Sequence, residues 1–394
     1  MKEKLIKRDL QTKLTQLAKG YPVIGIFGPR QSGKTTLAQM AFKNHAYVSL
    51  EDYKAKELAT NDPYGFFDLY HNKHGIILDE IQTVPTLFSY VQTWSDKHQK
   101  LGYFVLTGSQ NFLLNQAVTQ TLAGRIAITT LLPFSVSELT RARLLPKTLE
   151  RAVFHGGYPR IFTQKVESHE WYENYLRTYI ERDIRQLKNV ENLDLFKKFI
   201  GLCAGRTGQL LNISSLANDC GITANTTRSW LSLLQASYII FLLQPYHKNF
   251  SKRLIKSPKL YFYDTGLACS ILGIDESETL HTHYLRGGLV ESFILSELYK
   301  TLYNQGQEPR CYFWRDSIGH EVDSIIEYGS HTITLEIKAS KTIHHNYFDN
   351  LNYWNQLAKT DTKNNYVIYS GDENYKRTAG NVVSWKKCAN VLKK

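Results

Sequence analysis

Two glycines, a lysine and a threonine lie at fixed spacing in one short segment, Gly28-Pro29-Arg30-Gln31-Ser32-Gly33-Lys34-Thr35. The order fits the pattern G-x-x-x-x-G-K-[ST], whose glycines let backbone N–H groups turn toward phosphates. Lys34 would neutralise β- and γ-phosphate charge, and the Thr35 hydroxyl is a ligand that suits Mg²⁺. An apolar run, residues 22–27, precedes the loop, and a helical stretch begins at Lys34. The segment therefore predicts binding of ATP with Mg²⁺, with Thr36 as an additional contact.

A second apolar run, residues 75–78, ends in the acidic pair Asp79 and Glu80. Downstream of a phosphate-binding loop, this pair predicts that Asp79 contacts Mg²⁺, directly or through water. Glu80 is then placed to polarise the water that attacks the γ-phosphate. Because Glu80 is present, we expect hydrolysis of ATP rather than binding alone.

Other polar residues could complete this site. Residues 103–107 form a strand-like run whose end carries candidates for contact with the γ-phosphate or the water, namely Thr107, Ser109 and Gln110. Ordinary hydrogen bonding at a strand end is the alternative. Arg125 is a candidate arginine finger, with a structural salt bridge as its alternative, and Arg182 or Arg185 could play that part instead.

The C-terminal region contains three acidic residues and a lysine in a suggestive order. Glu291 lies in a helical stretch and Asp323 in a strand-like run, and Glu336 and Lys338 share one face at the end of the next run. This E…D…E-x-K order resembles the PD-(D/E)xK nucleases. The resemblance implies Mg²⁺ ligation by Asp323 and Glu336, and a catalytic role for all four residues. A degenerate nuclease fold kept for structure or binding, and an ordinary surface charge pattern, are the alternatives.

The elements that position these residues fall into three expected domains of an α/β protein. Residues 1–150 alternate strand-like and helical runs, which predicts a parallel sheet covered on both faces. Residues 151–275 are mostly helical by period. Residues 276–394 begin with a helix, residues 288–302, followed by strand-like runs at 311–314, 320–327, 331–337 and 365–369.

Residues 214–246 within the middle region are spaced like a winged helix-turn-helix. Helix 223–236 would be the recognition helix, and it exposes polar side chains at its start: Thr223, Asn225, Thr226, Arg228 and Ser229. Basic residues follow near the expected wing: Lys248, Lys252, Arg253 and Lys256. A winged helix used only for packing between domains is the alternative.

Composition is consistent with these expectations. The 394 residues carry a formal net charge of +12, which favours a polyanionic partner, DNA above all, although a basic surface also serves solubility. Five scattered cysteines argue against a disulfide framework and for a reducing cytoplasm. No apolar run is long enough to span a membrane. A homo-oligomer is compatible with the sequence.

Several short motifs together resemble those of prokaryotic AAA-type P-loop ATPases that carry a C-terminal domain of unknown function. They are the G-P-R-x-x-G-K-T loop, L-D-E-I-Q, T-G-S and L-A-G-R, and further on Gly156-Gly157-Tyr158-Pro159 and Tyr263-Asp264-Thr265-Gly266-Leu267. The resemblance implies the fold and an ATPase activity. We therefore expect an ATP-driven protein that acts on or senses nucleic acid. The alternative is a signalling or oligomerisation switch whose C-terminal domain is a non-catalytic interaction module.

Overall fold

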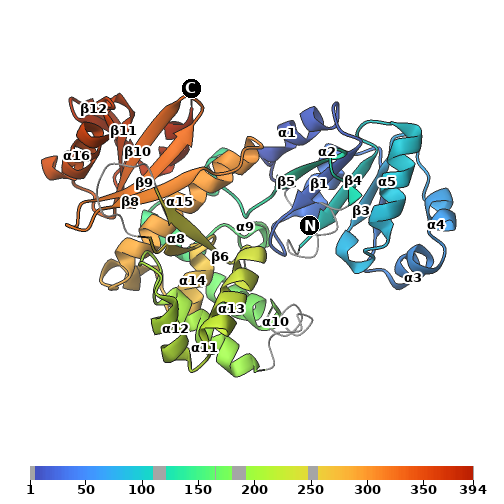
Figure 1. The fold of residues 1–394 in the computed structure, drawn as a ribbon, viewed down its shortest axis with the longest axis horizontal. Coiled ribbons are helices and arrows are strands. Elements are labelled where there is room, and N and C mark those ends of the chain that lie inside the picture. Colours follow the sequence, from blue (N-terminus) through green and yellow to red (C-terminus); the bar gives the residue numbers. More distant parts are fainter. Residues whose placement is uncertain (1–4, 110–120, 165, 180–191, 247–255, 394) are drawn as a thin grey trace.

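The computed structural model describes residues 5–109, 121–164, 166–179, 192–246 and 256–393. Two β-sheets lie at opposite ends of the molecule, and a group of helices lies between and below them (Figure 1). The first sheet contains the phosphate-binding loop, and the second contains the C-terminal acidic residues.

The first sheet has five parallel strands in the order β2-β3-β4-β1-β5. These are β1 (Val23–Phe27), β2 (Ala46–Ser49), β3 (Ile76–Asp79), β4 (Phe104–Gly108) and β5 (Ile126–Thr130). Strand β4 lies between β1 and β3, so the strand that ends in Thr107 separates the loop strand from the acidic strand. This confirms the predicted parallel sheet.

Helices cover both faces of this sheet, because alternate residues of its strands are apolar on both sides. One face packs against α1 (Leu10–Leu17) and α2 (Lys34–Ala41) through Leu10, Leu14, Leu37 and Ala38. The other face packs against α3 (Tyr53–Asn61), α4 (Pro63–Leu69) and α5 (Leu87–His98).

The middle of the chain is helical, as expected. Its helices are α7 (Val136–Ala142), α8 (Leu149–His155), α9 (Pro159–Thr163), α10 (Ser168–Tyr179), α11 (Leu193–Ala204), α12 (Ile213–Cys220), α13 (Ala224–Ala236) and α14 (Thr265–Ile271). Asn212 caps α12 and Thr223 caps α13, each by accepting a hydrogen bond from a backbone N–H. Gly221 ends α12 in the left-handed conformation that glycine adopts freely. Helices α12 and α13 lie where the sequence predicted helices, and the winged helix-turn-helix itself stays a prediction. The expected wing residues Lys248, Lys252 and Arg253 lie outside the described residues.

The second sheet has eight strands in the order β12-β13-β11-β10-β9-β8-β6-β7. They are β6 (Ile240–Pro245), β7 (Lys259–Phe262), β8 (Cys311–Arg315), β9 (Glu321–Tyr328), β10 (His331–Lys338), β11 (Asn365–Tyr369), β12 (Tyr375–Arg377) and β13 (Gly380–Ser384). Strand β6 pairs with β8, so the sheet extends across residue 275 into the middle of the chain. Strand β7, which the sequence pattern did not predict, forms the edge.

Helix α15 (Arg286–Asn304) packs on one face of this sheet and α16 (Asp349–Ala358) on the other. Helix α15 extends toward the first sheet, where its end lies near α1 (Figure 1). Short 3₁₀ segments lie at Ile81–Thr83, Ser277–His281, His345–Phe348, Thr362–Asn364 and Trp385–Leu392. All five cysteines are buried and unpaired. Within the described residues, no helix is long and apolar enough to cross a membrane.

Candidate functional site

The phosphate-binding loop connects β1 to α2, and two of its glycines are fixed by backbone geometry. Gly28 has φ +153°, and a Cβ atom there would lie 2.1 Å from the carbonyl oxygen of Leu131. Gly33 has φ +93° and immediately precedes α2. A side chain at either position would strain the loop, which explains the spacing of the motif.

Lys34 places its ammonium group inside this loop. The side chain is buried, and its Nζ donates hydrogen bonds to the carbonyl oxygens of Gly28 at 3.1 Å and Pro29 at 2.9 Å. Ser32 is fully buried, and its hydroxyl has no hydrogen-bond partner among the described residues. A buried ammonium and an unsatisfied buried hydroxyl beside the N-terminus of a helix suit a phosphate group.

The loop opens into a cavity of about 310 Å³. Predicted contact residues line it, namely Gln31, Gly33, Lys34, Thr35, Thr36 and Glu80. Helix α9 of the middle region lines its other side with Pro159, Arg160, Thr163 and Gln164. The cavity is therefore built from two parts of the chain. Arg30, also predicted as a contact, lies instead 3.9 Å from a carboxylate oxygen of Glu51.

Asp79 is the centre of a polar cluster at the carboxyl ends of β1, β3 and β4. Its Oδ1 accepts a hydrogen bond from Thr35 Oγ1 at 2.8 Å and another from Thr107 Oγ1. Its Oδ2 accepts from the hydroxyl of Tyr47 at 3.0 Å. Burial and the neighbouring Asp79 raise the pKa of Tyr47 to about 12, so Tyr47 is a neutral donor at pH 7. The structure thus places the predicted magnesium ligands Thr35 and Asp79 together.

Glu80 follows Asp79 in a strained conformation, with φ +57° and ψ +50°. Its backbone N–H donates to Thr107 Oγ1 at 3.2 Å, and its carboxylate accepts from Ser109 Oγ at 3.1 Å and from the Gln82 amide. The left-handed conformation of a non-glycine residue is uncommon, and here three polar neighbours hold it. Ser109 therefore orients Glu80.

The predicted arginine candidates are not brought to the cavity within the described residues. Arg125 forms an ion pair with Asp96, with Nε 2.5 Å from Oδ1 and a second hydrogen bond of 3.0 Å, and it does not line the cavity. The salt-bridge alternative describes this position, and a role for Arg125 in a neighbouring subunit stays a prediction. Gln110, Arg182 and Arg185 lie outside the described residues.

Arg8 is a structural residue of the site that sequence reasoning missed. Its guanidinium is buried and donates to the carbonyl oxygen of Ser32 at 2.7 Å, to that of Leu132 at 2.5 Å, and to Glu138 at 3.0 Å. It also lies over the ring of Phe134. Arg8 thus fastens the phosphate-binding loop to the segment that follows β5. Its partners are too distant in sequence for a local pattern to reveal them.

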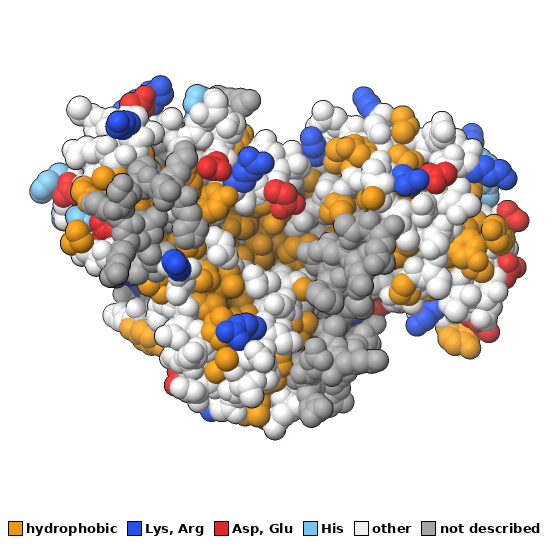
Figure 2. Space-filling model, in the orientation of Figure 1, with side chains coloured by type: hydrophobic (Ala, Val, Ile, Leu, Met, Phe, Trp, Pro, Cys, Tyr) orange, Lys and Arg blue, Asp and Glu red, His pale blue; other side chains and the backbone are white. Residues whose placement is uncertain are grey.

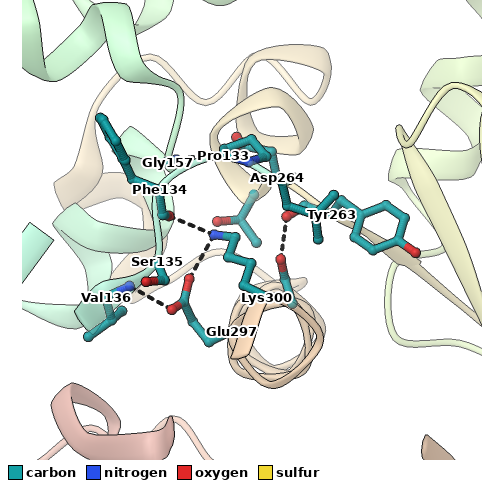
Figure 3. A network of polar contacts seen from close by, with 12 residues as sticks. Pro133, Phe134, Ser135, Val136, Gly157, Tyr263, Asp264, Glu297 and Lys300 are labelled. Atoms are coloured by element: carbon teal, nitrogen blue, oxygen red, sulfur yellow. Dashed lines mark hydrogen bonds and ion pairs between the residues drawn. The ribbon is translucent and has the colours of Figure 1, made fainter. Parts of the chain in front are cut away.

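The same segment is held from the other side by α15 (Figure 3). Lys300 Nζ donates to the carbonyl oxygen of Phe134 at 3.0 Å and to Glu297 at 2.7 Å, and Glu297 accepts from the backbone N–H of Val136 at 2.6 Å. We call Glu297 and Lys300 the clasp. The clasp residues are buried, and they connect residues 134–136, which follow the first sheet, directly to α15, which packs on the second sheet.

Asp264 holds together two segments of the middle region next to Phe134. Its Oδ2 accepts from the backbone N–H of Gly157 at 2.8 Å, and its Oδ1 accepts from the hydroxyl of Tyr172 at 2.6 Å. The backbone N–H of Phe134 in turn donates a hydrogen bond to the carbonyl oxygen of Gly157 at 2.7 Å. Two of the motifs quoted for the family resemblance, G-G-Y-P and Y-D-T-G-L, are therefore in contact through Gly157 and Asp264.

The four predicted C-terminal residues converge on one buried cluster. Glu291 comes from α15, Asp323 from β9, and Glu336 and Lys338 from β10. Lys338 Nζ lies 2.5 Å from Glu336 Oε1, and the backbone N–H of Ile337 donates to Asp323 Oδ2 at 2.7 Å. Asp323 and Glu336 are buried, whereas the side chains of Glu291 and Lys338 are 20% and 30% exposed. The burial of Asp323 and Glu336 is not typical of an ordinary surface charge pattern.

Burial and mutual repulsion make these carboxyl groups weak acids. Burial, with repulsion from Asp323, raises the pKa of Glu291 to about 7 and that of Glu336 to about 8. Burial also raises the pKa of Asp323, against the attraction of Lys259 and Lys338. Carboxylates that share a site cannot all ionise freely unless a cation joins them.

Lys259 of β7, absent from the sequence prediction, lies against this cluster. Its Nζ is 3.7 Å from Glu291 Oε2 and forms an ion pair with Glu321. Tyr261, two residues along β7, donates its hydroxyl to the same Glu291 oxygen at 2.8 Å. Within the described residues, no three Asp, Glu, His or Cys side chains are grouped so as to hold a metal ion. The observed arrangement therefore does not fit the divalent metal that the nuclease resemblance implies.

The candidate nucleic-acid residues begin α13 on the surface. Asn225 and Arg228 are exposed, and Arg228 donates to the side-chain oxygen of Asn225 at 3.1 Å, whereas Thr223 is used as the cap. Lys256 is exposed just before β7. Figure 2 shows lysine and arginine side chains interspersed with acidic ones over the described part of one face. The net charge is therefore not gathered into a single basic patch on that face.

Three family models match successive parts of the chain. An AAA domain matches residues 20–140, and two domains of unknown function, DUF8612 and DUF4143, match residues 146–278 and 286–388. The uncharacterized protein Rv2008c of Mycobacterium tuberculosis is 29% identical over 338 residues, which are 85% of this chain and 74% of the relative. The uncharacterized protein MJ1637 of Methanocaldococcus jannaschii is 23% identical, with 73% of this chain and 71% of the relative covered.

Solved structures of low similarity were also found. The Walker-type ATPase PABY2304 of Pyrococcus abyssi is 16% identical with a TM-score of 0.47, and 68% of this chain and 96% of that chain are covered. The RuvB branch migration motor of Thermotoga maritima is 18% identical with a TM-score of 0.32, and the coverage is 60% and 89%. Residues 20–140 therefore match an AAA domain and have the fold of a P-loop ATPase.

Proposed function

We propose that this protein hydrolyses ATP in a magnesium-dependent reaction at the loop between β1 and α2. The observation that carries the proposal is the contact of Thr35 with Asp79, at 2.8 Å, beside a Glu80 carboxylate held by Ser109. The residues fit the nucleotide and its metal, because the lysine, the unsatisfied Ser32 hydroxyl and the Thr35–Asp79 oxygen pair supply the groups that phosphates and Mg²⁺ require.

Each residue has a distinct part in this reaction. Lys34 and the backbone N–H groups of the loop would bind the phosphates, and Thr35 and Asp79 would hold Mg²⁺, which when bound neutralises phosphate charge. Glu80 would accept a proton from the attacking water, with Ser109 and Gln82 orienting its carboxylate. Helix α9 would form the other wall of the nucleotide cavity.

The test is the variant Glu80→Gln, with Glu57→Gln as its control because Glu57 is an exposed carboxylate of α3. We expect Glu80→Gln to bind ATP normally and to lose about 10²–10⁴-fold in turnover, the range for a general base. Turnover is measured by phosphate release, and binding with a fluorescent nucleotide. Wild-type turnover in Glu80→Gln would refute the role of Glu80.

The proposed use of this hydrolysis is to act on or sense nucleic acid, DNA above all, in the cytoplasm. The supporting observations are the net charge of +12 and the exposed polar start of α13 in its helix-turn-helix spacing. We expect DNA to change the rate of ATP turnover. We also expect the affinity of the protein for DNA to decrease steeply between 50 and 200 mM salt, as phosphate contacts require. An ATP turnover rate that nucleic acid leaves unchanged, together with no binding of nucleic acid at 50 mM salt, would favour the alternative. That alternative is an ATP-dependent signalling or oligomerisation switch.

The C-terminal domain is the second candidate for chemistry. The convergence of Glu291, Asp323, Glu336 and Lys338 favours a relation to the PD-(D/E)xK nucleases. Because Lys259 also lies against these carboxylates, we propose that the domain contributes binding or sensing, and not cleavage, while this arrangement persists. Incubation of the wild-type protein with plasmid or single-stranded DNA and Mn²⁺ tests this: cleavage that Asp323→Asn abolishes would contradict it.

A further inference from the structure

Lys259 is an unusual residue for its position. It lies at the start of the edge strand β7, yet its side chain is only 4% exposed. An edge-strand lysine ordinarily points into water, where its charge is solvated. Here the ammonium group instead turns inward toward Glu291 and Glu321 and lies 5.6 Å from the centre of the Phe313 ring. Burial of this charge requires the carboxylates as partners.

The carboxylate cluster requires a cation as much as Lys259 requires carboxylates. Four acidic side chains gather at the start of β9, at the end of β10 and on α15, namely Glu291, Glu321, Asp323 and Glu336. Three cations pair with them, namely Lys259, Arg315 and Lys338. The charges are therefore nearly balanced by the protein itself.

One carboxylate oxygen of the cluster has an unsatisfied hydrogen-bonding capacity. Glu336 is 5% exposed, and its Oε2 atom has no hydrogen-bond partner among the described residues. It lies near enough to Asp323 and Glu291 to feel their charges. A buried carboxylate oxygen beside two other carboxylates is the kind of donor that divalent cations select.

The geometry points to Lys259 as the resident cation of this cluster, one that occupies the position of a divalent metal ion and excludes it. The ammonium group and the metal compete for Glu291, because Lys259 already lies 3.7 Å from the oxygen that Tyr261 also binds. A second cation beside Lys259 would be repelled by it. Removal of Lys259 would leave Glu291 and Asp323, beside Glu336, without this neighbouring positive charge and would convert the cluster into a metal site.

The hairpin β6–β7 supplies this cation from outside the expected C-terminal domain. Lys259 precedes α14 and Glu291 follows it. Strand β7 pairs with β6 and is joined by backbone hydrogen bonds to residues 208–211 and by side-chain hydrogen bonds to α15. The metal affinity of the cluster thus depends on the position of a strand that follows the helix-turn-helix unit.

The experiment measures Mn²⁺ binding without nucleotide, by the loss of the free Mn²⁺ EPR signal, in wild type and Lys259→Met. Wild type should show only the weak Mn²⁺ binding that is common to all variants. Lys259→Met should bind one additional Mn²⁺ with an affinity on the order of tenfold or more above that weak binding. Lys259→Arg keeps the charge and should resemble wild type. Lys256→Met is the matched control, because it removes an exposed lysine three residues away.

Two further variants protect the test. If Lys259→Met does not fold, Lys259→Met/Glu321→Gln also removes the charge of a carboxylate that has lost Lys259 and retains only Arg315 as its cation, and this variant should fold and bind Mn²⁺. Addition of Glu336→Gln to either variant should abolish the new binding. The inference is overturned if wild type binds the additional Mn²⁺ as tightly as Lys259→Met, or if no variant without Lys259 gains a site. Because no ATP is present, neither result depends on the proposed ATP hydrolysis.

Discussion

The clasp between α15 and the ATPase segment yields a prediction whose size follows from burial. Glu297 and Lys300 are 2% and 5% exposed, and each also bonds to the backbone of residues 134–136. Substitution of Lys300 by methionine leaves the Glu297 carboxylate buried without a cation, and the Phe134 carbonyl without a donor. Breaking a buried ion pair on one side costs about 3–5 kcal/mol. We expect Lys300→Met to lose stability of that order.

The double variant Glu297→Gln/Lys300→Met separates a lost attraction from a stranded charge. A glutamine at 297 is neutral and its side-chain oxygen can still accept from the backbone N–H of Val136. The double variant should therefore recover most of the loss and lie within about 1–2 kcal/mol of wild type. Lys341→Met, at an exposed position, is the control and should leave stability unchanged. Differential scanning calorimetry at pH 7 provides the comparison.

The dependence on pH gives this prediction a definite sign. Burial raises the pKa of Glu297 above its ordinary value of 4.5, and Lys300 opposes that rise. In Lys300→Met the folded state therefore holds a proton that the unfolded state releases as the pH rises above that value. Stability should decrease by about 1.4 kcal/mol per pH unit from there to the raised pKa, and then level off. A deficit that shrinks as the pH rises, or a double variant as unstable as Lys300→Met, would refute the reasoning.

Three other substitutions test the ATP site. Gly28→Ala should lower nucleotide affinity by more than about tenfold without unfolding the chain, because its Cβ would lie 2.1 Å from the Leu131 carbonyl oxygen; normal affinity in a fluorescent-nucleotide titration would contradict this. Arg125→Ala should leave ATP turnover at wild-type level, because Arg125 pairs with Asp96 outside the cavity. If turnover is lost, Arg125→Ala can be mixed with Glu80→Gln, which keeps Arg125. Restored turnover in the mixture would instead place Arg125 at the ATP site of a neighbouring subunit. Tyr47→Phe removes a donor to Asp79 and should raise the Mg²⁺ concentration for half-maximal turnover by up to about tenfold; an unchanged value would show that Tyr47 does not position Asp79.

Local patterns carried the predictions that the structure confirms. The phosphate-binding loop is a continuous segment, and its glycines are fixed by the backbone of the same turn, so spacing alone predicts the conformation. The strand ends at Asp79 and Thr107 could be brought together in prediction because parallel strands end at one edge of a sheet. Alternation along β10 similarly placed Glu336 and Lys338 on one face.

Residues whose partners are remote were the ones that prediction missed. Arg8 bonds to Glu138 across 130 positions, and Lys300 bonds to Phe134 across 166. Lys259, in the sequence Pro258-Lys259-Leu260, has the pattern of an exposed lysine at a strand end. Each is a buried cation with at least one hydrogen-bond or ion-pair partner from another element, and no local periodicity encodes that contact.

Helix α15 carries Glu291 of the carboxylate cluster and both residues of the clasp. Glu297 follows Glu291 by six positions, a rise of about 9 Å or less than two turns, over which a packed α-helix behaves as one rigid unit. The clasp fixes this helix to residues 134–136, and Arg8 fixes the preceding Leu132 to Ser32 of the phosphate-binding loop. A shift of the loop would therefore be opposed by, or passed to, the helix that positions Glu291 against Lys259. One buried arginine and one buried ion pair thus connect the phosphate-binding loop to α15 through residues in contact.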